Sequence, residues 1–417
     1  MATELPAVII DNGSSTMKSG FSDENAPKSV FSTIVGRTNG NILPASIPNS
    51  NGVFIGDSAQ QNRDICDLHY PIENGRIVRW DDMEAVWDHI YSNELKVKSE
   101  ERRCMLTEAI LNPDENKEKM AEIMFEKFNV PSLHIASQAV LPIYASGKTT
   151  GLVFHSGDGV TSIAPVYEGN IILSGVCRMD MAGGELTNYM HKILQTMGEE
   201  TYASVGFKRF NVEEKETVRL IKEKTAYVAI DFEKEKAEFE LEADPSKKQC
   251  NYTLPDGRVI VVGAERFYTP EGLFNPRMLN KELPGIHEAI HRSICNVHPK
   301  YRICMIKNII VSGGNTLLPG FVERLNKELK CLTEPESRDV INVEAQPDRR
   351  NSVWRGAAVI ASSETFDQWV SKKDYEENGV SAFKRYQYFP RDSESEEKAQ
   401  REKDSLLGKV LGCFSTK

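Results

Sequence analysis

Two segments about 144 residues apart carry the same pattern of apolar and polar positions. Each begins with an apolar run and continues into a glycine-rich stretch: AVIIDNGSSTMK occupies 7–18 and GLVFHSGDGVTS occupies 151–162. After the glycines the pattern again becomes that of a strand, with SGF at 19–21 and IAPVY at 163–167, and no helical period begins. The pattern therefore predicts one β-hairpin in each half of the chain, within a duplicated α/β domain.

Helical periodicity predicts the elements around these hairpins. Apolar residues recur at 83, 86, 87, 90 and 91 and again at 120, 123, 124 and 128, which predicts helices over 83–95 and 116–128. We expect both helices to flank the first sheet. A third apolar run, NIIVSGGNT at 308–316, also leads into glycines and precedes a helical pattern over 320–329.

Three segments are expected to lie outside the packed α/β units. Residues 37–56 contain two prolines among Gly, Asn and Ser, which is typical of a long exposed loop. Residues 211–249 are dense in charge, so we expect most of them to form a solvated face. Residues 391–417 form a polar tail that ends in a short apolar patch, for which disorder and the docking of a partner or a membrane surface both stay open.

Composition excludes several classes of protein. The 417 residues are enough for two or three domains, and a net charge of −10 argues against nonspecific nucleic-acid binding. No stretch reaches the roughly 18 uninterrupted apolar residues of a membrane span, and Glu4 lies where a signal peptide would be basic. The eight cysteines include no CxxC pair. We therefore expect a soluble, unexported protein with reduced thiols, no transmembrane segment and no nucleic-acid partner.

The glycine-rich hairpins indicate a phosphate site. Backbone N–H groups of such turns can converge on a phosphate, because glycine lets the main chain approach closely. Two opposed hairpins would hold the phosphate from both sides, Asp11 at the end of the first strand could hold a hydrated Mg²⁺, and Lys18 would add positive charge. Each hairpin alone also fits a tight turn in an unrelated sheet. The repeat, together with the Ser312-Gly313-Gly314 unit, favours the phosphate site.

Three shorter motif matches are less informative. ASGKT at 145–149 resembles the end of a P-loop, but Pro142 stands where that loop requires glycine. GDGVTS at 157–162 begins like a dinucleotide-binding motif, but Ser162 replaces its last glycine. HEAIH at 287–291 matches the zinc-peptidase pattern, with His287 and His291 as ligands and Glu288 as base. An apolar stripe along the same helix favours a partly solvated face, and zinc peptidase stays a distant alternative.

Many stretches in the same order make the chain similar to actins and actin-related proteins over roughly residues 5–390, as a divergent member. They include IIDNGSS at 9–15, YPIENG at 70–75, WDDME at 80–84, LTEAILNP at 106–113, SGDGVT at 156–161, LPDGRVI at 254–260, VSGGNT at 311–316 and SVWRGAA at 352–358. The resemblance implies an α/β fold of duplicated actin-like (ribonuclease H-like) domains around a central nucleotide cleft. It also implies ATP or ADP with Mg²⁺ or Ca²⁺ as cofactors.

The resemblance implies the domain limits as well. The first lobe is expected to comprise 1–145 and 352–390, with 34–70 as an inserted subdomain. The second lobe is expected to comprise 146–351, with 182–280 inserted. Residues 391–417 lie beyond the resemblance, as a charged C-terminal extension.

Roles carry over position by position. Asp11 resembles the acid that orders metal-bound water, and Gln138 resembles the glutamine that positions the attacking water. The residues that resemble nucleotide contacts are Ser14, Ser15 and Lys18 in the first loop, Gly157, Asp158, Gly159 and Val160 in the second, Lys222 and Glu223 beside the adenosine, and Gly313, Gly314, Asn315 and Arg350 beneath the nucleotide or against its base.

Two departures bear on catalysis. The family has Asp where His155 stands and His where Ser162 stands. An imidazole cannot replace the negative charge that organises metal hydration, and the usual histidine is a group expected to orient the attacking water. We therefore expect ATP to bind and its hydrolysis to be slow. The rival hypothesis makes His155 itself the catalytic base.

The expected function is that of an actin-related ATP-binding cytoskeletal protein. It would act as a nucleotide-stabilised subunit or interaction platform in a cytoplasmic filament or motility-related complex, with actin-like subunits or cytoskeletal or motor-complex proteins as partners. The alternative is a divergent conventional actin that polymerises and hydrolyses ATP on assembly. The loop over 38–53, with Pro44 and Pro48, and Asn170 in place of an aromatic residue depart from the surfaces through which actin subunits meet.

Overall fold

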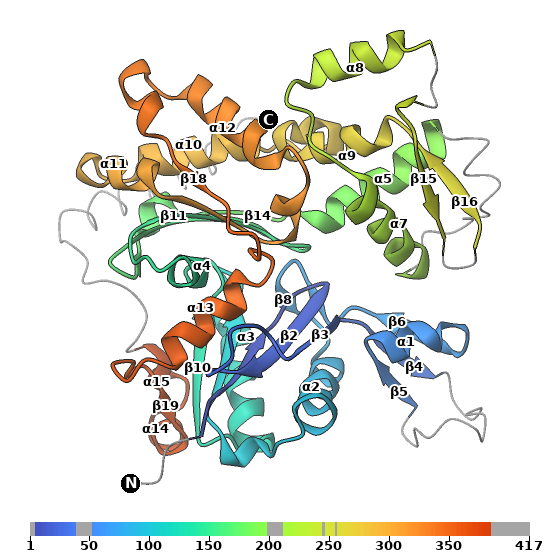
Figure 1. Ribbon diagram of the computed structural model, residues 1–417. Helices are drawn as coiled ribbons and strands as arrows, with labels where there is room; N and C mark the ends of the chain where they lie inside the picture. The colour runs from blue at the N-terminus through green and yellow to red at the C-terminus, as the bar shows by residue number, and fades with distance from the viewer. Residues whose placement is uncertain (1–4, 39–51, 198–211, 244–246, 255–256, 385–417) are drawn as a thin grey trace, which may run out of the picture.

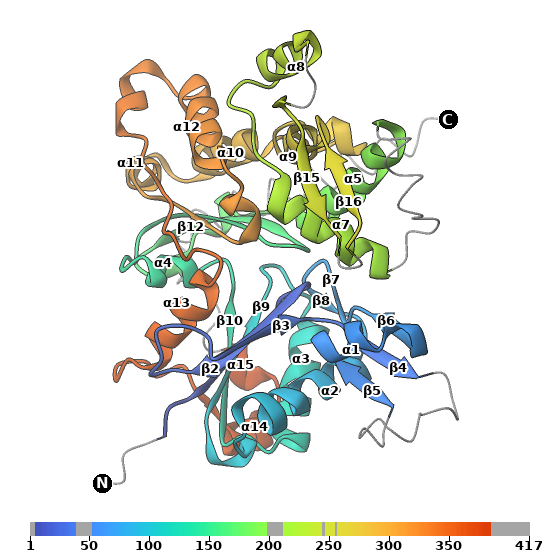
Figure 2. The same cartoon turned by 45° about the vertical axis from the view of Figure 1, so that its right-hand side comes forward.

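The protein consists of two lobes, one above the other in Figures 1 and 2, each built on its own β-sheet. The computed structural model describes residues 5–38, 52–197, 212–243, 247–254 and 257–384. Two helices pack at the junction of the lobes, α4 (Leu141–Ala145) and α13 (Ser352–Ala361). A Cβ at Gly356 would lie 1.9 Å from the Leu141 carbonyl oxygen, so this close crossing requires glycine.

The first sheet contains the predicted N-terminal hairpin. β1 pairs antiparallel with β2 and parallel with β9, and the apolar run of β1 is buried along its whole length. The strands, in sheet order, are β19 (Val370–Ser371), β10 (Ser132–Ser137), β9 (Cys104–Glu108), β1 (Val8–Asp11), β2 (Thr16–Phe21) and β3 (Ser29–Ser32).

The second sheet repeats this design. β11 pairs antiparallel with β12 and parallel with β17, as β1 does with β2 and β9. The path runs through β13 (Asn170–Ile171), β12 (Thr161–Tyr167), β11 (Gly151–Ser156), β17 (Ile309–Ser312) and β18 (Val343–Glu344), and β14 (Cys177–Met179) also pairs with β12. Both predicted hairpins are confirmed, and the shared strand order confirms the duplication.

Helices of the first lobe pack on its sheet as the periodicity predicts. The first predicted helix begins at Trp80 as α2 (Trp80–His89) and ends in a π-helical turn, Ile90–Leu95. The second is α3 (Asp114–Glu122), followed by a π-helical turn, Ile123–Lys127. Their apolar residues share one core with the sheet, and this core includes the fully buried Trp87 and Phe125. The lobe ends with α14 (Lys372–Asn378) and α15 (Ser381–Lys384).

Helices of the second lobe lie above its sheet and to one side of it (Figure 1). The helices over the sheet are α10 (Ile286–Asn296), α11 (Pro299–Lys307) and α12 (Phe321–Leu332), and α12 confirms the helix predicted over 320–329. The side group contains α5 (Gly183–Met197), α7 (Val212–Thr225), α8 (Phe232–Leu241), α9 (Glu265–Phe274) and the hairpin of β15 (Cys250–Thr253) and β16 (Val259–Val262).

The prediction of a long loop over 37–56 is wrong at both ends of the segment. β4 (Val35–Thr38) pairs with β5 (Val53–Ile55) and with β6 (Cys66–His69), beside α1 (Asp57–Gln61). Phe54 is buried with Ile34 and Ala59, so the apolar positions near the ends of the segment form a small core. Residues 39–51 of the predicted loop lie outside the described residues.

The charge-dense segment 211–249 divides into two different helices. No residue of α8 is buried, as expected of a solvated face. α7 instead buries Val218, Ile221 and Lys222, because its apolar positions pack against α5 and the β15–β16 hairpin. The tail over 391–417 lies outside the described residues. The predicted domain limits stay predictions.

Candidate nucleotide site

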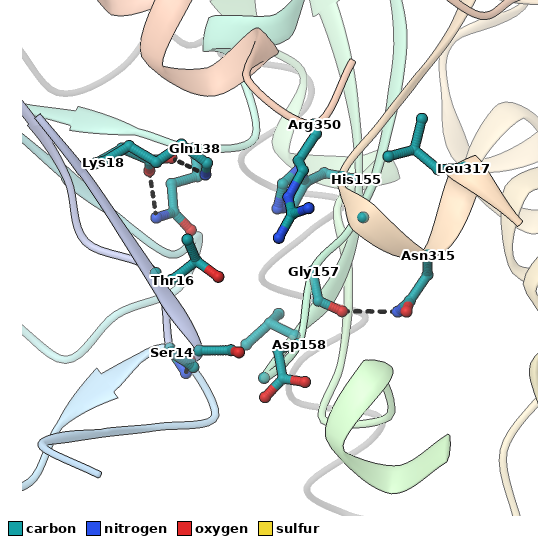
Figure 3. A pocket seen from close by; sticks show the side chains of 18 of the residues that line it. Ser14, Thr16, Lys18, Gln138, His155, Gly157, Asp158, Asn315, Leu317 and Arg350 are labelled. Atoms are coloured by element: carbon teal, nitrogen blue, oxygen red, sulfur yellow. Dashed lines mark hydrogen bonds and ion pairs between the residues drawn. The ribbon is translucent and has the colours of Figure 1, made fainter. Parts of the chain in front are cut away.

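The turns of the two hairpins meet at a cavity between the lobes. The Gly75 N–H donates to Ser14 Oγ at 3.0 Å, and a Cβ at Gly159 would lie 2.4 Å from the same oxygen. All the predicted site residues line this cavity (Figure 3): Asp11, Ser14, Ser15, Lys18, Gln138, His155, Gly157, Asp158, Gly159, Val160, Lys222, Glu223, Gly313, Gly314, Asn315 and Arg350. Residues from six separate parts of the chain therefore converge on one space.

Asp11 is the buried anionic centre on the side of the first lobe. It is the last residue of β1, and its Oδ2 accepts from Lys18 Nζ at 2.8 Å, across the hairpin. Its Oδ1 accepts from Thr107 Oγ1 at 2.8 Å and from Gln138 Nε2 at 3.1 Å. Both carboxylate oxygens are thus held in place, and the charge is balanced by one lysine.

Gln138 is held at the edge of the same cluster. Besides Asp11, its Nε2 lies 3.1 Å from the Asn12 carbonyl oxygen and 3.0 Å from Thr107 Oγ1. The side-chain nitrogen therefore faces Asp11 and its neighbours. The oxygen of the Gln138 amide takes part in none of these three contacts.

His155 faces Asp11 and Lys18 from the second lobe. Its Nδ1 lies 2.9 Å from Ser312 Oγ, on the adjacent parallel strand β17. Burial lowers the pKa of His155 to about 4, although the charge of Asp11 raises it, and Lys18 lowers it further. The imidazole is therefore neutral near pH 7. Ser162 is buried and lies directly opposite His155 on β12.

The third glycine-rich segment, residues 313–315, forms one side of the cavity, which we call its floor. Gly313 has a φ of +92°, and a Cβ there would lie 2.2 Å from the Ser156 carbonyl oxygen. Gly314 is different, because an added Cβ would meet no protein atom within 4 Å. Asn315 Nδ2 donates to Ser156 Oγ at 3.0 Å and to the Gly157 carbonyl at 2.7 Å (Figure 3). The floor and the second hairpin turn are thus one hydrogen-bonded unit.

Lys222 is buried where α7 meets the start of α5. Its Nζ donates to the Gly183 carbonyl at 2.6 Å and to Thr187 Oγ1 at 2.8 Å, and burial lowers its pKa. The neighbouring Glu223 is exposed and accepts from Arg219. Lys222 therefore braces the wall of the cavity, and Glu223 lies at the rim.

Several residues that shape the site were missed by the sequence analysis. Thr107 ties Asp11 to β9, and Arg349 holds Thr316, with its Nε 3.0 Å from Oγ1 and its Nη2 2.8 Å from the carbonyl oxygen. Arg350, which was predicted, is exposed and lines the cavity. Thr107 and Arg349 lie in no glycine-rich turn, so the pattern that revealed the hairpins carried no signal for them.

The geometry agrees with a comparison of the sequence with protein-family models. Residues 2–387 match the family described as Actin. The chain belongs to the actin family. This confirms both the resemblance and the α/β actin-like fold, and it makes the chain an actin-like ATP-binding protein of cytoskeletal type. Actin-family proteins generally bind ATP or ADP with a divalent cation.

The residues of this actin-family cavity fit a cation that is bound mainly by phosphates. Among the residues that the structure describes, no group of three His, Cys, Asp or Glu side chains is placed to hold a metal ion directly. Asp11 already accepts hydrogen bonds on both oxygens, which suits contact with metal-bound water better than direct ligation. The donor set therefore fits a hydrated, phosphate-bound Mg²⁺ or Ca²⁺.

Two observations on helix α10 count against the zinc-peptidase alternative. Glu288 Oε2 accepts from the Gly285 N–H at 3.1 Å at the start of α10, so the supposed base is engaged with the first turn of its own helix. His287 and His291 are both partly exposed, as the apolar stripe predicted. No helix within the described ranges is long and apolar enough to cross a membrane.

Proposed function

We propose that this protein is an actin-related subunit or interaction platform that binds ATP, keeps it for long times, and uses the bound nucleotide to stabilise its two-lobed form. Its place would be in a cytoplasmic filament or motility-related complex, beside actin-like subunits or cytoskeletal or motor proteins. The observation that carries the proposal is the neutral His155 facing Asp11 across the cavity.

Phosphate binding would come from both hairpin turns. Backbone N–H groups and hydroxyls at Ser14 and Ser15 would hold the phosphates from below, and the turn from Gly157 to Val160 would hold them from above. Lys18 would supply the positive charge. The adenosine would lie between the Lys222–Glu223 wall, the Gly313–Asn315 floor and Arg350. The convergence of these residues on one cavity supports the assignment.

A divalent cation bound to the phosphates would neutralise charge and orient them. Asp11 would hold water of its hydration shell, and Gln138, fixed by Asp11 and Thr107, would position a second water near the terminal phosphate. These residues supply one carboxylate. From the second lobe, His155 would offer an uncharged imidazole, so no negative charge at that position would help to hold the hydration shell of the cation.

Slow hydrolysis follows from that asymmetry. A neutral imidazole with a pKa of about 4 is a weak proton acceptor at pH 7, and Ser162 beside it has no basic group at that pH. Each missing preorganised group costs very roughly 10- to 1000-fold in rate. The strong base of the rival hypothesis is therefore not favoured at His155.

The proposal is tested by the nucleotide content of freshly purified protein. Chromatography of the acid extract should give close to one ATP or ADP per chain when Mg²⁺ or Ca²⁺ is supplied. Lys18→Ala should lower that content, whereas Lys234→Ala, on the exposed helix α8, should not. Protein that is empty and takes up neither nucleotide would overturn the proposal.

The polymerising alternative has its own test. Sedimentation and electron microscopy with Mg-ATP distinguish the two functions, since a conventional actin forms long filaments of itself. We expect at most short oligomers, because Asn170, exposed at the start of β13, offers no aromatic anchor for a neighbouring subunit. Long filaments formed by the pure protein would favour the alternative.

A further inference from the structure

His155 belongs to a chain of hydrogen bonds that leads away from the cavity. His155 Nδ1 lies 2.9 Å from Ser312 Oγ, and Ser312 Oγ lies 2.6 Å from Ser352 Oγ. Ser352 Oγ in turn donates to the Arg349 carbonyl at 3.0 Å. Ser312 and Ser352 are both buried. This series of hydrogen bonds thus joins strand β11, strand β17 and the first turn of α13.

The number of available protons determines which group donates in each of these hydrogen bonds. A carbonyl oxygen can only accept, so Ser352 gives its single hydroxyl proton to Arg349. Ser352 must then accept from Ser312, which in turn has no proton left for the imidazole. Ser312 Oγ therefore accepts from the ring, and the proton of the neutral imidazole resides on Nδ1.

The other ring nitrogen, Nε2, then carries no proton and has a lone pair on the cavity side. His155 Nε2 lies 3.4 Å from the position that a Cβ on Gly157 would take, and both residues line the cavity. No protein donor within the described residues is bonded to Nε2. Lys18 Nζ and Gln138 Nε2, the nearby donors from the first lobe, are directed to Asp11. The natural partner of Nε2 is consequently a water molecule.

We propose that Ser312 and Ser352 are positioning residues that hold His155 as its Nδ1–H tautomer, so that Nε2 accepts a hydrogen bond from water beside the phosphates in the cavity. The inference rests on the proposed nucleotide site for the identity of that water. It gives His155 the task of orienting water without taking its proton, which is consistent with slow turnover. The opposite tautomer would direct an N–H at the same water and orient it differently.

The tautomer is measured by NMR on protein labelled with ¹⁵N-histidine. The chain has eight histidines, and His155→Asn assigns the signals of His155 by removing them. In the wild-type protein, Nδ1 should show the shift of a protonated nitrogen and Nε2 that of an unprotonated one. An Nε2–H form in the wild-type protein would overturn the inference.

The serine chain is tested in the same spectra. In Ser352→Ala, the Ser312 hydroxyl is released to donate to Nδ1, so the signals should move toward the Nε2–H form. Ser352→Thr keeps a hydroxyl and should restore the wild-type tautomer. Ser312→Ala provides a second variant should the first fail to fold. Ser293→Ala is the matched control, since buried Ser293 also donates to a carbonyl, that of Gly175, elsewhere in the lobe. An unchanged tautomer in both alanine variants would refute the role of the serines.

The role of Nε2 is tested by release of phosphate from bound ATP in a single turnover. His155→Asn keeps a donor toward Ser312 and removes the acceptor on the cavity side, so the rate should fall roughly five- to tenfold. His155→Gln places an amide oxygen near the position of Nε2 and should keep most of the rate. Equal rates in both variants would overturn the role of Nε2.

These two measurements separate failure of the inference from failure of the proposed function. The NMR experiment needs no nucleotide, so it decides the tautomer even in a protein that binds none. Absence of bound nucleotide would refute the proposed function together with the water-orienting role. A wrong tautomer in a protein that binds nucleotide normally would refute the inference alone.

Discussion

Tyr70 Oη donates a hydrogen bond of 2.5 Å to Glu216 Oε1, which joins the first lobe to helix α7 of the second. Lys215, next to Glu216, lies over the Tyr70 ring at 5.1 Å. Burial and the Glu216 charge raise the pKa of Tyr70, so the hydroxyl keeps its proton and stays a donor. Tyr70 is close in sequence to Gly75, and Glu216 is close in sequence to Lys222. Both Gly75 and Lys222 line the cavity. We therefore expect the contact between Tyr70 and Glu216 to hold the two lobes together beside the cavity.

Tyr70→Phe should therefore speed the release of nucleotide. Hydrogen bonds to charged groups contribute about 1.5–3 kcal/mol, so we expect release of a fluorescent ATP analogue to become about tenfold faster. Tyr227→Phe is the control, because Tyr227 makes the same kind of bond to Glu235 at 2.6 Å within one lobe. Equal release from the wild-type protein and Tyr70→Phe would show that the contact does not hold the lobes together.

The two adjacent glycines of the cavity floor should respond differently to alanine. Gly313→Ala places a Cβ 2.2 Å from a backbone oxygen at positive φ, so it should lower the free energy of unfolding by about 2 kcal/mol or more. Gly314→Ala meets no protein atom and should leave stability nearly unchanged while weakening nucleotide binding. Thermal unfolding and titration with nucleotide measure the two effects. Equal nucleotide affinity in Gly314→Ala and the wild-type protein would argue against a nucleotide beside the floor.

Local patterns predicted those parts of the site that lie within single strands and turns. The hairpins at Asp11 and Gly157 each consist of an apolar run followed by glycines, and that signal is contained in about a dozen residues. The roles of the remaining cavity residues came from the family resemblance. The roles of Ser352 and Arg349 could not be predicted, because they depend on α13 returning to the second sheet from 40 residues beyond Ser312.

The charge state of His155 shows a second limit of the sequence. The residue type alone allows a neutral or a charged ring near pH 7, and only the buried position, 2.9 Å from Ser312, decides for the neutral one. The loop predicted over 37–56 failed for a related reason. The Gly and Pro residues of this segment favoured a loop, whereas the burial of Phe54 depends on Ile34 and Ala59, which lie outside the segment.

Stability should fall in mild acid because of two buried histidines. Burial lowers the pKa of both His134 and His155 to about 4. The unfolded chain takes up these protons near pH 6.5 and the folded protein only near pH 4, so stability is present above pH 6.5 and is lost between pH 6.5 and 4. Each histidine should cost about 2 kcal/mol between pH 7.5 and pH 5.

Urea unfolding at the two pH values measures this loss. His134→Gln, which lies outside the cavity, should remove about half of the loss attributed to the pair. An identical pH dependence in His134→Gln and the wild-type protein would contradict a neutral, buried His134.

Two basic residues on helix α12 should differ strongly in their contribution to stability. Arg324 is buried and pairs with Glu271 at 2.9 Å, whereas Lys327 is exposed and pairs with Asp231 at 3.2 Å. Arg324→Ala leaves the buried carboxylate of Glu271 unpaired and should cost about 3–5 kcal/mol. Lys327→Ala should cost less than about 1 kcal/mol. Urea unfolding at pH 7 compares them, and similar losses would contradict the burial of the Arg324–Glu271 pair.

The central claim is that the chain binds ATP in the cavity between its lobes and hydrolyses it slowly because His155 is an uncharged group at a position where the family has a carboxylate. Its most direct test is a single-turnover measurement of phosphate release from protein loaded with γ-labelled ATP and Mg²⁺, beside ordinary actin under the same conditions. We expect release at least tenfold slower than from ordinary actin, and faster release in His155→Asp than in the wild-type protein. A wild-type rate equal to that of ordinary actin, with no gain in His155→Asp, would contradict the account.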